Sequence, residues 1–356
     1  MNMKAITVLG QNNIVMRDEP VRELEPDEVL CRVVFTGVCG TDLAIYAGTT
    51  TFVTSGQIKY PVRIGHEWSG YVVKCGKDVT LFKEGDRVVS ETAVACRKCE
   101  ACKKGDFSNC KYTRSVGTID AWDGSYAEYV IFPESHLYHL PDEISYEQGA
   151  MIEPLQIAYA GMRKFTITKD SVVAVIGTGP IGMCCLALAK AMGAGKIIMI
   201  GRTDFKLDIA KKMGATDVIN IRNVDAVAEI KRITDGKGVD FVAETSGANT
   251  TVQQSIDICA KRGLCVMLGF YETKLDDVDF SDAIFKELTI RGIMGEWKLV
   301  PEIIDFIMKS GMTTMPMITR EVEFDDCVDY FKNFRETHKV DIKTLVKITD
   351  VDESLR

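Results

Sequence analysis

Residues 172–268 repeat a pattern in which a short apolar run is followed by a segment with helical spacing. Residues 172–176 are all apolar and mostly β-branched, which is typical of a strand buried on both faces of a parallel sheet. Residues 181–192 have the small, alanine-rich composition of a closely packed helix, and residues 196–200 form a second apolar run. This alternation predicts an α/β fold with a doubly wound parallel sheet, with further strands at 217–221, 239–244, 264–268 and 288–294.

The first 150 residues have a different pattern. Short runs that favour β-structure, among them 28–35 and 68–75, are separated by glycine, proline and aspartate. A helix is expected at about 145–165, between the two regions. We therefore predict two domains, a β-rich one over residues 1–150 and one with alternating strands and helices over residues 151–294.

Length and composition narrow the class of protein. A chain of 356 residues with 46% apolar residues is long enough for two hydrophobic cores. The net charge of −8 and the dispersed basic residues argue against a nucleic-acid partner or an acidic membrane. No apolar run approaches the roughly eighteen residues of a membrane span, and the first residues lack the apolar core of a signal peptide. We therefore expect a cytoplasmic protein.

Gly177, Gly179 and Gly182 follow the first strand of the sheet with the spacing G-x-G-x-x-G. Gly177 permits a tight turn, Gly179 lets the backbone approach a pyrophosphate, and Gly182 lets the helix pack closely on the strand. Pro180 and Ile181 open the helix, whose free N–H groups and positive dipole end attract an anion. An ordinary glycine-rich turn is the alternative, but the strand before it and the helix after it favour a dinucleotide-binding loop.

The end of the second strand indicates which dinucleotide binds. An NAD site usually has an acidic residue about twenty residues after the glycines, where it bonds the ribose 2′-hydroxyl. This chain has Gly201 at that position, followed by Arg202, and Asp204 comes three residues late. Arg202 and Lys206 can pair with a 2′-phosphate, although both could also be solvated surface residues. We therefore predict NADP(H) in preference to NAD(H).

Ligands of open parallel sheets bind at the carboxyl ends of the strands. The residues at those ends, which are candidates to line the nicotinamide side of the cleft, are Thr245, Ser246, Leu268, Gly269 and Met294. For each residue taken alone, packing in a turn or in the core is at least as good an explanation.

Four of the twelve cysteines lie close together and suggest a metal site. Their pattern, C-x2-C-x2-C-x7-C, can close a tetrahedral zinc site with no open position. The common iron–sulfur run has a closer fourth cysteine followed by proline, whereas Lys111 follows the fourth cysteine here. Two adjacent disulfides would be geometrically poor and would need an oxidising compartment. We therefore predict structural zinc bound by Cys96, Cys99, Cys102 and Cys110.

A second group of potential metal ligands is spread over two loops. Cys39 lies in the segment 36–43, and His66 and Glu67 lie just before an expected strand. Thiolate, imidazole and carboxylate are the ligands of zinc sites that keep one position open for water or substrate. Each residue also has an ordinary explanation, as a buried thiol, a strand-end histidine or a solvated glutamate. Spacing alone leaves the choice open.

Taken together and in order, these motifs resemble the zinc-dependent medium-chain dehydrogenases/reductases: the glycine pattern, Cys39-Gly-Thr-Asp42, Gly65-His66-Glu67 and the four cysteines. The motif Glu153-Pro154 is similar to the polyol branch, which includes sorbitol, threonine and cyclitol dehydrogenases. The resemblance covers essentially the whole chain. It implies a GroES-like catalytic domain over 1–150 that is completed by 295–356, a Rossmann domain over 151–294, and a homodimer or homotetramer.

The resemblance also implies roles for particular residues. Glu153 would lie at the catalytic zinc, as a ligand or as the partner of its water, although an acid before a proline also suits a helix N-terminus. Glu296 and Trp297 follow the last strand of the sheet, where polyol enzymes place residues that contact the substrate. The ligands of the catalytic zinc would be drawn from Cys39, His66, Glu67 and Glu153.

We therefore predict an enzyme that interconverts a secondary alcohol and its ketone, with a polyol, cyclitol or sugar derivative as the small-molecule substrate. Hydride would pass between the carbinol carbon and nicotinamide, and the proton would leave through Thr41. Threonine and sorbitol dehydrogenases typically have a histidine where this chain has Ala44, so the next proton carrier is missing. Asp42, Tyr46, or ribose and water are possible replacements.

Two other hypotheses stay open. The first is an NAD-dependent L-threonine 3-dehydrogenase, against which Ala44 and Gly201 argue. The second is a protein that binds nucleotide or zinc without catalysis, and the intact residues Cys39, Thr41, His66 and Glu67 argue against it.

Overall fold

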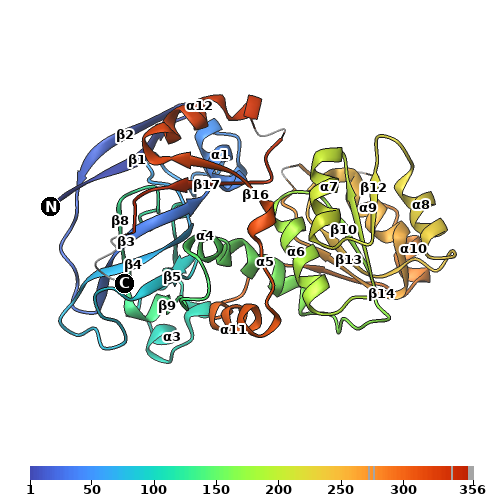
Figure 1. The fold of residues 1–356 in the computed structure, drawn as a ribbon, viewed down its shortest axis with the longest axis horizontal. Helices are drawn as coiled ribbons and strands as arrows, with labels where there is room; N and C mark the ends of the chain where they lie inside the picture. The colour runs from blue at the N-terminus through green and yellow to red at the C-terminus, as the bar shows by residue number, and fades with distance from the viewer. Residues whose placement is uncertain (272, 276, 338–339, 352–356) are drawn as a thin grey trace. The chain divides into compact units, whose positions relative to one another are not determined.

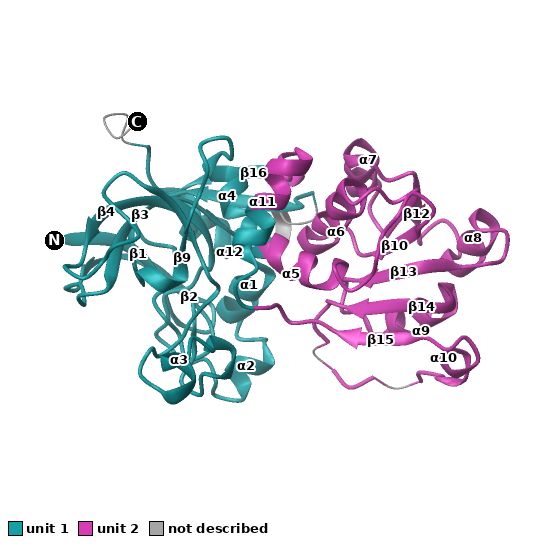
Figure 2. Ribbon diagram, turned by 90° about the horizontal axis from the view of Figure 1, so that it is seen from below, with its two compact units in different colours: residues 1–153, 297–304, 318–356 teal, residues 154–296, 305–317 magenta. Residues whose placement is uncertain are grey.

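The computed structural model describes residues 1–271, 273–275, 277–337 and 340–351. The chain divides into two units, which Figure 2 shows in teal and magenta. Unit 1 comprises Met1–Glu153, Trp297–Ile304 and Ile318–Arg356, and unit 2 comprises Pro154–Glu296 and Asp305–Met317.

Unit 1 is rich in β-structure (Figure 1). Its strands are β1 (Asn2–Gly10), β2 (Asn13–Pro20), β3 (Glu28–Gly37), β4 (Glu67–Cys75), β5 (Arg87–Ser90), β6 (Ala93–Val94), β7 (Arg114–Ser115), β8 (Tyr129–Pro133), β9 (Leu137–His139), β16 (Ile318–Glu323) and β17 (Lys343–Lys347). Its helices are α1 (Gly40–Ala47), α2 (Thr51–Thr54), α3 (Glu100–Lys103), α4 (Tyr146–Ala150) and α12 (Cys327–Thr337), with short 3₁₀ turns at Phe107–Asn109, Glu134–His136 and Phe324–Asp326.

The seven-stranded sheet of unit 1 has the order β16-β17-β3-β4-β5-β9, and β8 also pairs with β3. Strand β3 is buried along almost its whole length, as its run of valine, leucine and phenylalanine predicts. It pairs with β17 on one side and with β4 on the other, so that Gly37 lies opposite both Leu345 and Glu67. The sheet therefore brings three distant parts of the sequence together at the end of β3.

Unit 2 contains an all-parallel sheet of six strands in the order β12-β11-β10-β13-β14-β15. Helices lie on both faces of the sheet (Figure 2), with α6 packed against α7 and α8 against α9. The predicted α/β fold with a doubly wound parallel sheet is confirmed. The strands are β10 (Val172–Ile176), β11 (Lys196–Gly201), β12 (Asp217–Asn220), β13 (Val239–Glu244), β14 (Cys259–Met267) and β15 (Thr289–Gly292), and the helices are α6 (Pro180–Ala191), α7 (Asp204–Met213), α8 (Ala226–Ile233), α9 (Asn249–Ile258) and α10 (Ser281–Phe285).

The helix expected at 145–165 is two helices. Helix α4 ends at Ala150, Met151 forms its C-cap, and α5 (Ile152–Met162) begins directly afterwards. Pro154 explains the break, because proline has no N–H and fits only the first turn of a helix. The break places Glu153 in the first turn of α5, at the end of unit 1.

The predicted tail, 295–356, is divided between the two units, and its first two residues, 295–296, belong to unit 2. Helix α11 (Val300–Ser310) begins in unit 1, but residues 305–317, which include the 3₁₀ turn Met315–Met317, belong to unit 2. One reason is that the Phe306 ring packs 5.7 Å from the Tyr159 ring of α5. Among the described residues, no helix is both long and apolar enough to cross a membrane.

Candidate metal centres and cofactor site

Cys39, His66 and Glu67 come together in unit 1. One thiol sulfur, one imidazole nitrogen and one carboxylate oxygen from these residues all lie within 4.8 Å of one another. Cys39 is the N-cap of α1, and His66 and Glu67 lie where β4 begins. The pairing of β3 with β4 explains why the two loops meet. We call these three residues the mixed-ligand group.

The backbone around Cys39 fixes the direction of its side chain. The Cys39 sulfur accepts a hydrogen bond from the Thr41 N–H at 3.5 Å, and the Asp42 carboxylate accepts one from the Cys39 N–H at 3.0 Å. This reciprocal arrangement is a capping box, which satisfies free N–H groups at the start of α1. It also places Thr41, the predicted proton carrier, in the first turn beside the ligand sulfur.

Asp42 is fully buried and faces His66. Its Oδ1 lies 3.7 Å from His66 Nδ1 and accepts a hydrogen bond from the Gly65 N–H at 3.2 Å. Burial alone would lower the pKa of His66, but the Asp42 carboxylate and the Cys39 thiol raise it well above its usual value. The separation of 3.7 Å is an electrostatic contact and not a hydrogen bond, since His66 Nδ1 has no hydrogen-bond partner among the described residues. A carboxylate near one ring nitrogen is nevertheless typical of histidines that ligate zinc through the other.

Lys343 completes the surroundings of the mixed-ligand group, and the sequence analysis missed it. Its fully buried ammonium contacts the Glu67 carboxylate and donates to the Val38 carbonyl at 3.1 Å. Burial alone would lower the pKa of Lys343, but Glu67 and Cys39 raise it above its usual value. Lys343 is 276 residues from Glu67, and the only signal in the sequence is a lysine at the start of an apolar strand.

Glu153 lies beside the mixed-ligand group rather than within it. Its Oε1 accepts a hydrogen bond from the Thr92 hydroxyl at 3.4 Å. Burial and the negative charge of Glu67 raise the pKa of Glu153 to about 7, while His66 and Lys343 act in the opposite direction. Glu153 therefore shares the electrostatic environment of the three ligands.

The four predicted cysteines also come together, in a lobe that we define as residues 96–110. Their sulfurs all lie within 4.8 Å of one another, with 3.4 Å between Cys99 and Cys102 and 3.8 Å between Cys96 and Cys102. Sulfurs bound tetrahedrally at about 2.3 Å from zinc are separated by about 3.8 Å, so the spacing fits this metal. Burial would raise the pKa of Cys110, but hydrogen bonds, first among them one from the Cys96 N–H, lower it to about 6 and favour the thiolate.

The glycine loop lies between β10 and α6, as predicted. Gly177 has a φ of +110°, which favours glycine, and a side chain at Gly182 would overlap the Gly177 carbonyl. Gly179 is the N-cap of α6, with open space where a Cβ atom would lie, and Pro180 and Ile181 form the first turn. The loop therefore presents free N–H groups to an open region.

The end of β11 has the arrangement that the sequence suggests. Gly201 is the last residue of the strand, Arg202 follows it and is exposed, and Lys206 lies in α7. Asp204 is turned toward the neighbouring strand, where its Oδ1 accepts a hydrogen bond from the Asn220 amide at 2.6 Å.

The predicted nicotinamide-lining residues lie at or beyond the carboxyl ends of β13, β14 and β15. The Thr245 hydroxyl donates to the Ile176 carbonyl at 2.8 Å, which ties the end of β13 to the glycine loop. The N–H groups of Leu268 and Gly269 donate to the Glu244 carbonyl at 2.8 and 3.1 Å. The Met294 side chain is 70% exposed. The assignment of these residues to the cofactor stays a prediction.

Glu296 and Trp297 have protein partners. The Glu296 carboxylate forms ion pairs with Lys164 and, at 3.8 Å, with Arg163. The Trp297 ring lies 6.0 Å from Phe107 of the four-cysteine lobe. These contacts give both residues a structural role, and substrate contact stays a prediction.

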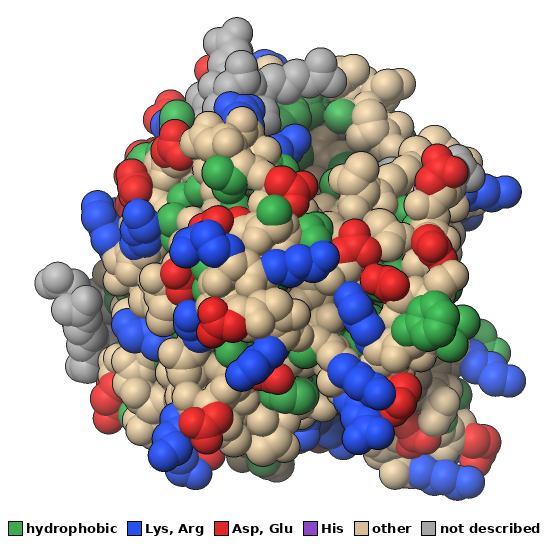
Figure 3. All heavy atoms as spheres, turned by 90° about the vertical axis from the view of Figure 1, so that its right-hand side faces the viewer, with side chains coloured by type: hydrophobic (Ala, Val, Ile, Leu, Met, Phe, Trp, Pro, Cys, Tyr) green, Lys and Arg blue, Asp and Glu red, His purple; other side chains and the backbone are tan. Residues whose placement is uncertain are grey.

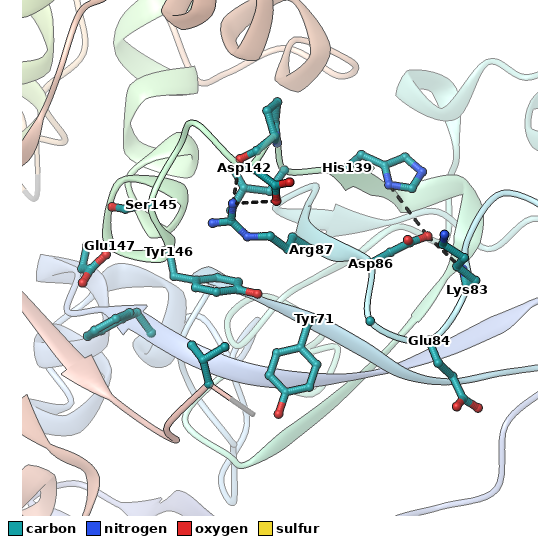
Figure 4. A pocket seen from close by; sticks show the side chains of 15 residues that line it. Tyr71, Lys83, Glu84, Asp86, Arg87, His139, Asp142, Ser145, Tyr146 and Glu147 are labelled. Atoms are coloured by element: carbon teal, nitrogen blue, oxygen red, sulfur yellow. Dashed lines mark hydrogen bonds and ion pairs between the residues drawn. The ribbon is translucent and has the colours of Figure 1, made fainter. Parts of the chain in front are cut away.

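Unit 1 also contains a groove of about 880 Å³ that none of the predicted site residues lines (Figure 4). Arg87 crosses it, donates to the carbonyls of Pro141 and Ile144 at 2.9 and 2.6 Å, and stacks 4.3 Å from the centre of the Tyr146 ring. Both terminal nitrogens of this arginine are therefore bonded to its own chain.

Charged side chains of both signs lie on the surface of unit 2. On the face of unit 2 shown in Figure 3, acidic and basic side chains are interspersed, and no broad field of one sign is seen.

Two protein families match the chain. Residues 25–142 match the alcohol dehydrogenase GroES-like domain, and residues 180–309 match the zinc-binding dehydrogenase domain. The chain belongs to the zinc-dependent medium-chain dehydrogenases/reductases. The predicted family and enzyme class are therefore confirmed.

Individual relatives span nearly the whole chain. The sorbitol dehydrogenase of Bacillus subtilis (strain 168) is 32% identical over 345 residues, which cover 97% of each chain. Among solved structures, the 2R,3R-butanediol dehydrogenase from Bacillus subtilis has a TM-score of 0.87 and 30% identity, and covers 98% of this chain and 100% of its own. A zinc-binding dehydrogenase from Sinorhizobium meliloti 1021 bound to NADP has a TM-score of 0.85 and 28% identity, with the same coverage.

Together these matches establish a zinc-dependent oxidoreductase of the alcohol and polyol dehydrogenase type. The enzyme uses a nicotinamide cofactor and acts on a small molecule.

Proposed function

We propose that this enzyme interconverts a secondary alcohol of a polyol, cyclitol or sugar derivative and the corresponding ketone, with NADP(H) as the preferred cofactor. The observation that carries the proposal is the mixed-ligand group beside Glu153 in unit 1, because its thiol, imidazole and carboxylate donors match an open zinc site. Zinc bound there supplies Lewis-acid polarisation of the substrate oxygen.

The chain's own residues have separate tasks around this site. Asp42 faces the Nδ1 side of the His66 ring at 3.7 Å, and Lys343 offsets the charge of Glu67. Thr41, in the first turn of α1, is placed to pass the alcohol proton outward. Water, the ribose of the cofactor or Tyr46 would continue the path that lacks a histidine at Ala44.

We assign the four-cysteine lobe a structural zinc. Four thiols fill a tetrahedral site and leave no position for substrate. Bound metal therefore fastens residues 96–110 and takes no part in the reaction.

The preference for NADP(H) is supported by three features at the end of β11. A side chain at Gly201 would overlap Thr178, so an acidic residue that binds the ribose does not fit there. Asp204, the nearest acid, is held by Asn220. Arg202 is exposed and available to a 2′-phosphate.

Paired titrations with NADPH and NADH test this preference through the fluorescence of each nicotinamide. We expect tighter binding of NADPH and loss of that preference in Arg202→Asp. Lys212→Asp, in the last turn of α7, makes the same change of charge at the other end of the helix and should keep the preference. Tighter binding of NADH by the native enzyme would overturn the proposal and direct attention to Asp204.

We also propose that the enzyme forms a homodimer or homotetramer. Strand β15 is an edge strand, and its neighbouring helix α10 exposes Ile284 and Phe285 at 74% and 79%. An open strand edge beside exposed apolar side chains fits pairing with a second copy. Light scattering after gel filtration tests the assembly, and Ile284→Lys should shift it toward monomer, whereas a native monomer would refute it.

A further inference from the structure

Glu244 is a buried carboxylate that the reaction does not use. It is the last residue of β13, is fully buried, and forms no ion pair with a described lysine, arginine or histidine. Its carboxylate is instead surrounded by neutral donors. It accepts hydrogen bonds from the Ser246 N–H (2.8 Å) and hydroxyl (2.7 Å), the Gly247 N–H (3.2 Å), the Thr251 hydroxyl (2.8 Å) and the Tyr271 hydroxyl (2.6 Å).

These donors come from three segments of unit 2. Ser246 and Gly247 lie in the loop after β13, Thr251 lies in the first turn of α9, and Tyr271 follows β14. Burial and the Glu244 carboxylate raise the pKa of Tyr271, which keeps its hydroxyl protonated as a donor. One side chain therefore ties the ends of two neighbouring strands together.

Close packing of the backbone reinforces this tie. A Cβ atom at Gly269 would lie 2.7 Å from Glu244 Oε2, so the carboxylate fills the space that a side chain would need. The Leu268 and Gly269 N–H groups bond the Glu244 carbonyl, and so the main chain and the side chain of one residue hold the same loop. The position of residues 268–271 consequently depends on Glu244.

We propose that Glu244 is a positioning residue for the nicotinamide half of the cofactor. The inference rests on the proposed function and on the prediction from the sequence that Thr245, Leu268 and Gly269 line the nicotinamide side at the carboxyl edge of the sheet. Glu244 holds these residues in place through the loops on either side. The glycine loop, which receives the diphosphate, forms no hydrogen bond with the Glu244 carboxylate among the described residues, and its link to β13 is the Thr245 hydroxyl.

The chemistry of the carboxylate explains why an amide would not replace it. Both oxygens of Glu244 accept hydrogen bonds, Oε1 from the loop after β13 and from α9, and Oε2 from Tyr271. A glutamine has a single acceptor oxygen and would direct an NH₂ group toward one of these sets of donors. Glu244→Gln should loosen one of the loops while the volume of the side chain is kept.

The test compares NADPH with 2′-phospho-ADP-ribose, which is the same molecule without nicotinamide, in direct binding titrations. We expect Glu244→Gln to weaken binding of NADPH about tenfold and binding of 2′-phospho-ADP-ribose by less than twofold. Tyr271→Phe removes only the hydrogen bond to Oε2. It should change the ratio of the two dissociation constants, that of NADPH to that of 2′-phospho-ADP-ribose, by a smaller factor. NADH and ADP-ribose are titrated in parallel, so the ratio can be measured whichever cofactor the enzyme prefers.

Asp240→Asn is the matched control. Asp240 lies near the opposite end of the same strand and accepts a hydrogen bond from the Val172 N–H at 2.8 Å. The Asp240→Asn variant should leave the ratio of the two dissociation constants unchanged even if it lowers the stability of the fold. Equal weakening of both ligands by Glu244→Gln, or no change in either, would overturn the positioning role. A native enzyme that prefers NADH would instead refute the cofactor preference and leave this inference intact.

Discussion

The two groups of metal ligands in unit 1 differ in the origin of their donors. The four-cysteine lobe takes all its donors from residues 96–110, so a short loop can close on a metal by itself. The mixed-ligand group takes its donors from two loops and is bordered by β17 and α5. The first group is a local feature of the chain, whereas the second exists only when the sheet has formed.

Their surroundings differ as well. Beside the four-cysteine lobe, the rings of Phe107 and His136 stack at 4.9 Å. Around the mixed-ligand group lie the buried side chains of Asp42 and Lys343 and the partly buried side chain of Glu153. Buried charges are costly to a fold, and their accumulation at one point is typical of a site kept for chemistry. The comparison therefore supports the proposal that the four-cysteine lobe stabilises the fold and that the mixed-ligand group takes part in the reaction.

Removal of a metal-binding side chain should have the largest effect, and the effect should differ in kind between the two sites. We expect His66→Ala to lower kcat/KM about 10⁴-fold, equivalent to about 5.5 kcal/mol, because the open metal site loses a ligand. Cys99→Ala should instead remove the metal of the lobe and lower stability. Zinc analysis and kinetics on both variants measure the difference. Full zinc content and near-native activity in His66→Ala would break the comparison.

Removal of the buried cation should have the next largest effect. Lys343→Met leaves the Glu67 carboxylate buried without its partner, and we expect the free energy of unfolding to fall by about 3–5 kcal/mol. Urea unfolding measures this change, and the double variant Lys343→Met/Glu67→Gln should recover part of it. Lys347→Met is the matched control, because Lys347 lies on the same strand but pairs with the exposed Asp350. Equal effects of the two lysine variants would contradict the argument.

The contrast also explains what could be read from the sequence. The cysteine lobe and the glycine loop are local patterns. Spacing predicts the first, spacing together with the flanking strand and helix predicts the second, and the structure brings the four sulfurs together. Lys343 and Glu244 could not be predicted, because their partners depend on strand pairing and loop packing across long stretches of chain. The break between α4 and α5 at Met151 could have been predicted, since Pro154 excludes a continuous helix.

His136 should make the lobe sensitive to acid. Its Nε2 accepts a hydrogen bond from the Ala95 N–H at 3.0 Å, so the ring is neutral, and burial lowers its pKa to about 4. In the unfolded chain the pKa of a histidine is about 6.5. The contribution of the neutral His136 ring to the free energy of unfolding is therefore fully present above that pH and is lost as pH falls toward about 4. We expect it to reach about 3 kcal/mol, measured as the pH dependence of urea unfolding.

Two variants isolate that contribution. His136→Gln should remove this part of the slope of stability against pH. Phe107→Leu removes the stacked ring and should lower stability without changing the slope. An unchanged slope in His136→Gln would show that the imidazole does not take up the proton.

The smallest effect on activity is expected from the threonine hydroxyl groups, one beside the mixed-ligand group and one beside the four-cysteine lobe. We expect Thr41→Val to lower kcat about tenfold, or about 1.4 kcal/mol, because water or ribose can replace one proton carrier but less directly. Thr41→Ser keeps the hydroxyl and should retain most of the activity. The control is Thr113→Val, since the Thr113 hydroxyl donates to the Cys110 carbonyl at 3.1 Å and lies beside the lobe instead. Equal values of kcat for Thr41→Val and Thr113→Val would remove Thr41 from the proton path and leave Tyr46 or solvent as its first member. A lower kcat in Thr41→Val alone would show that proton transfer belongs to the mixed-ligand group and not to the four-cysteine lobe.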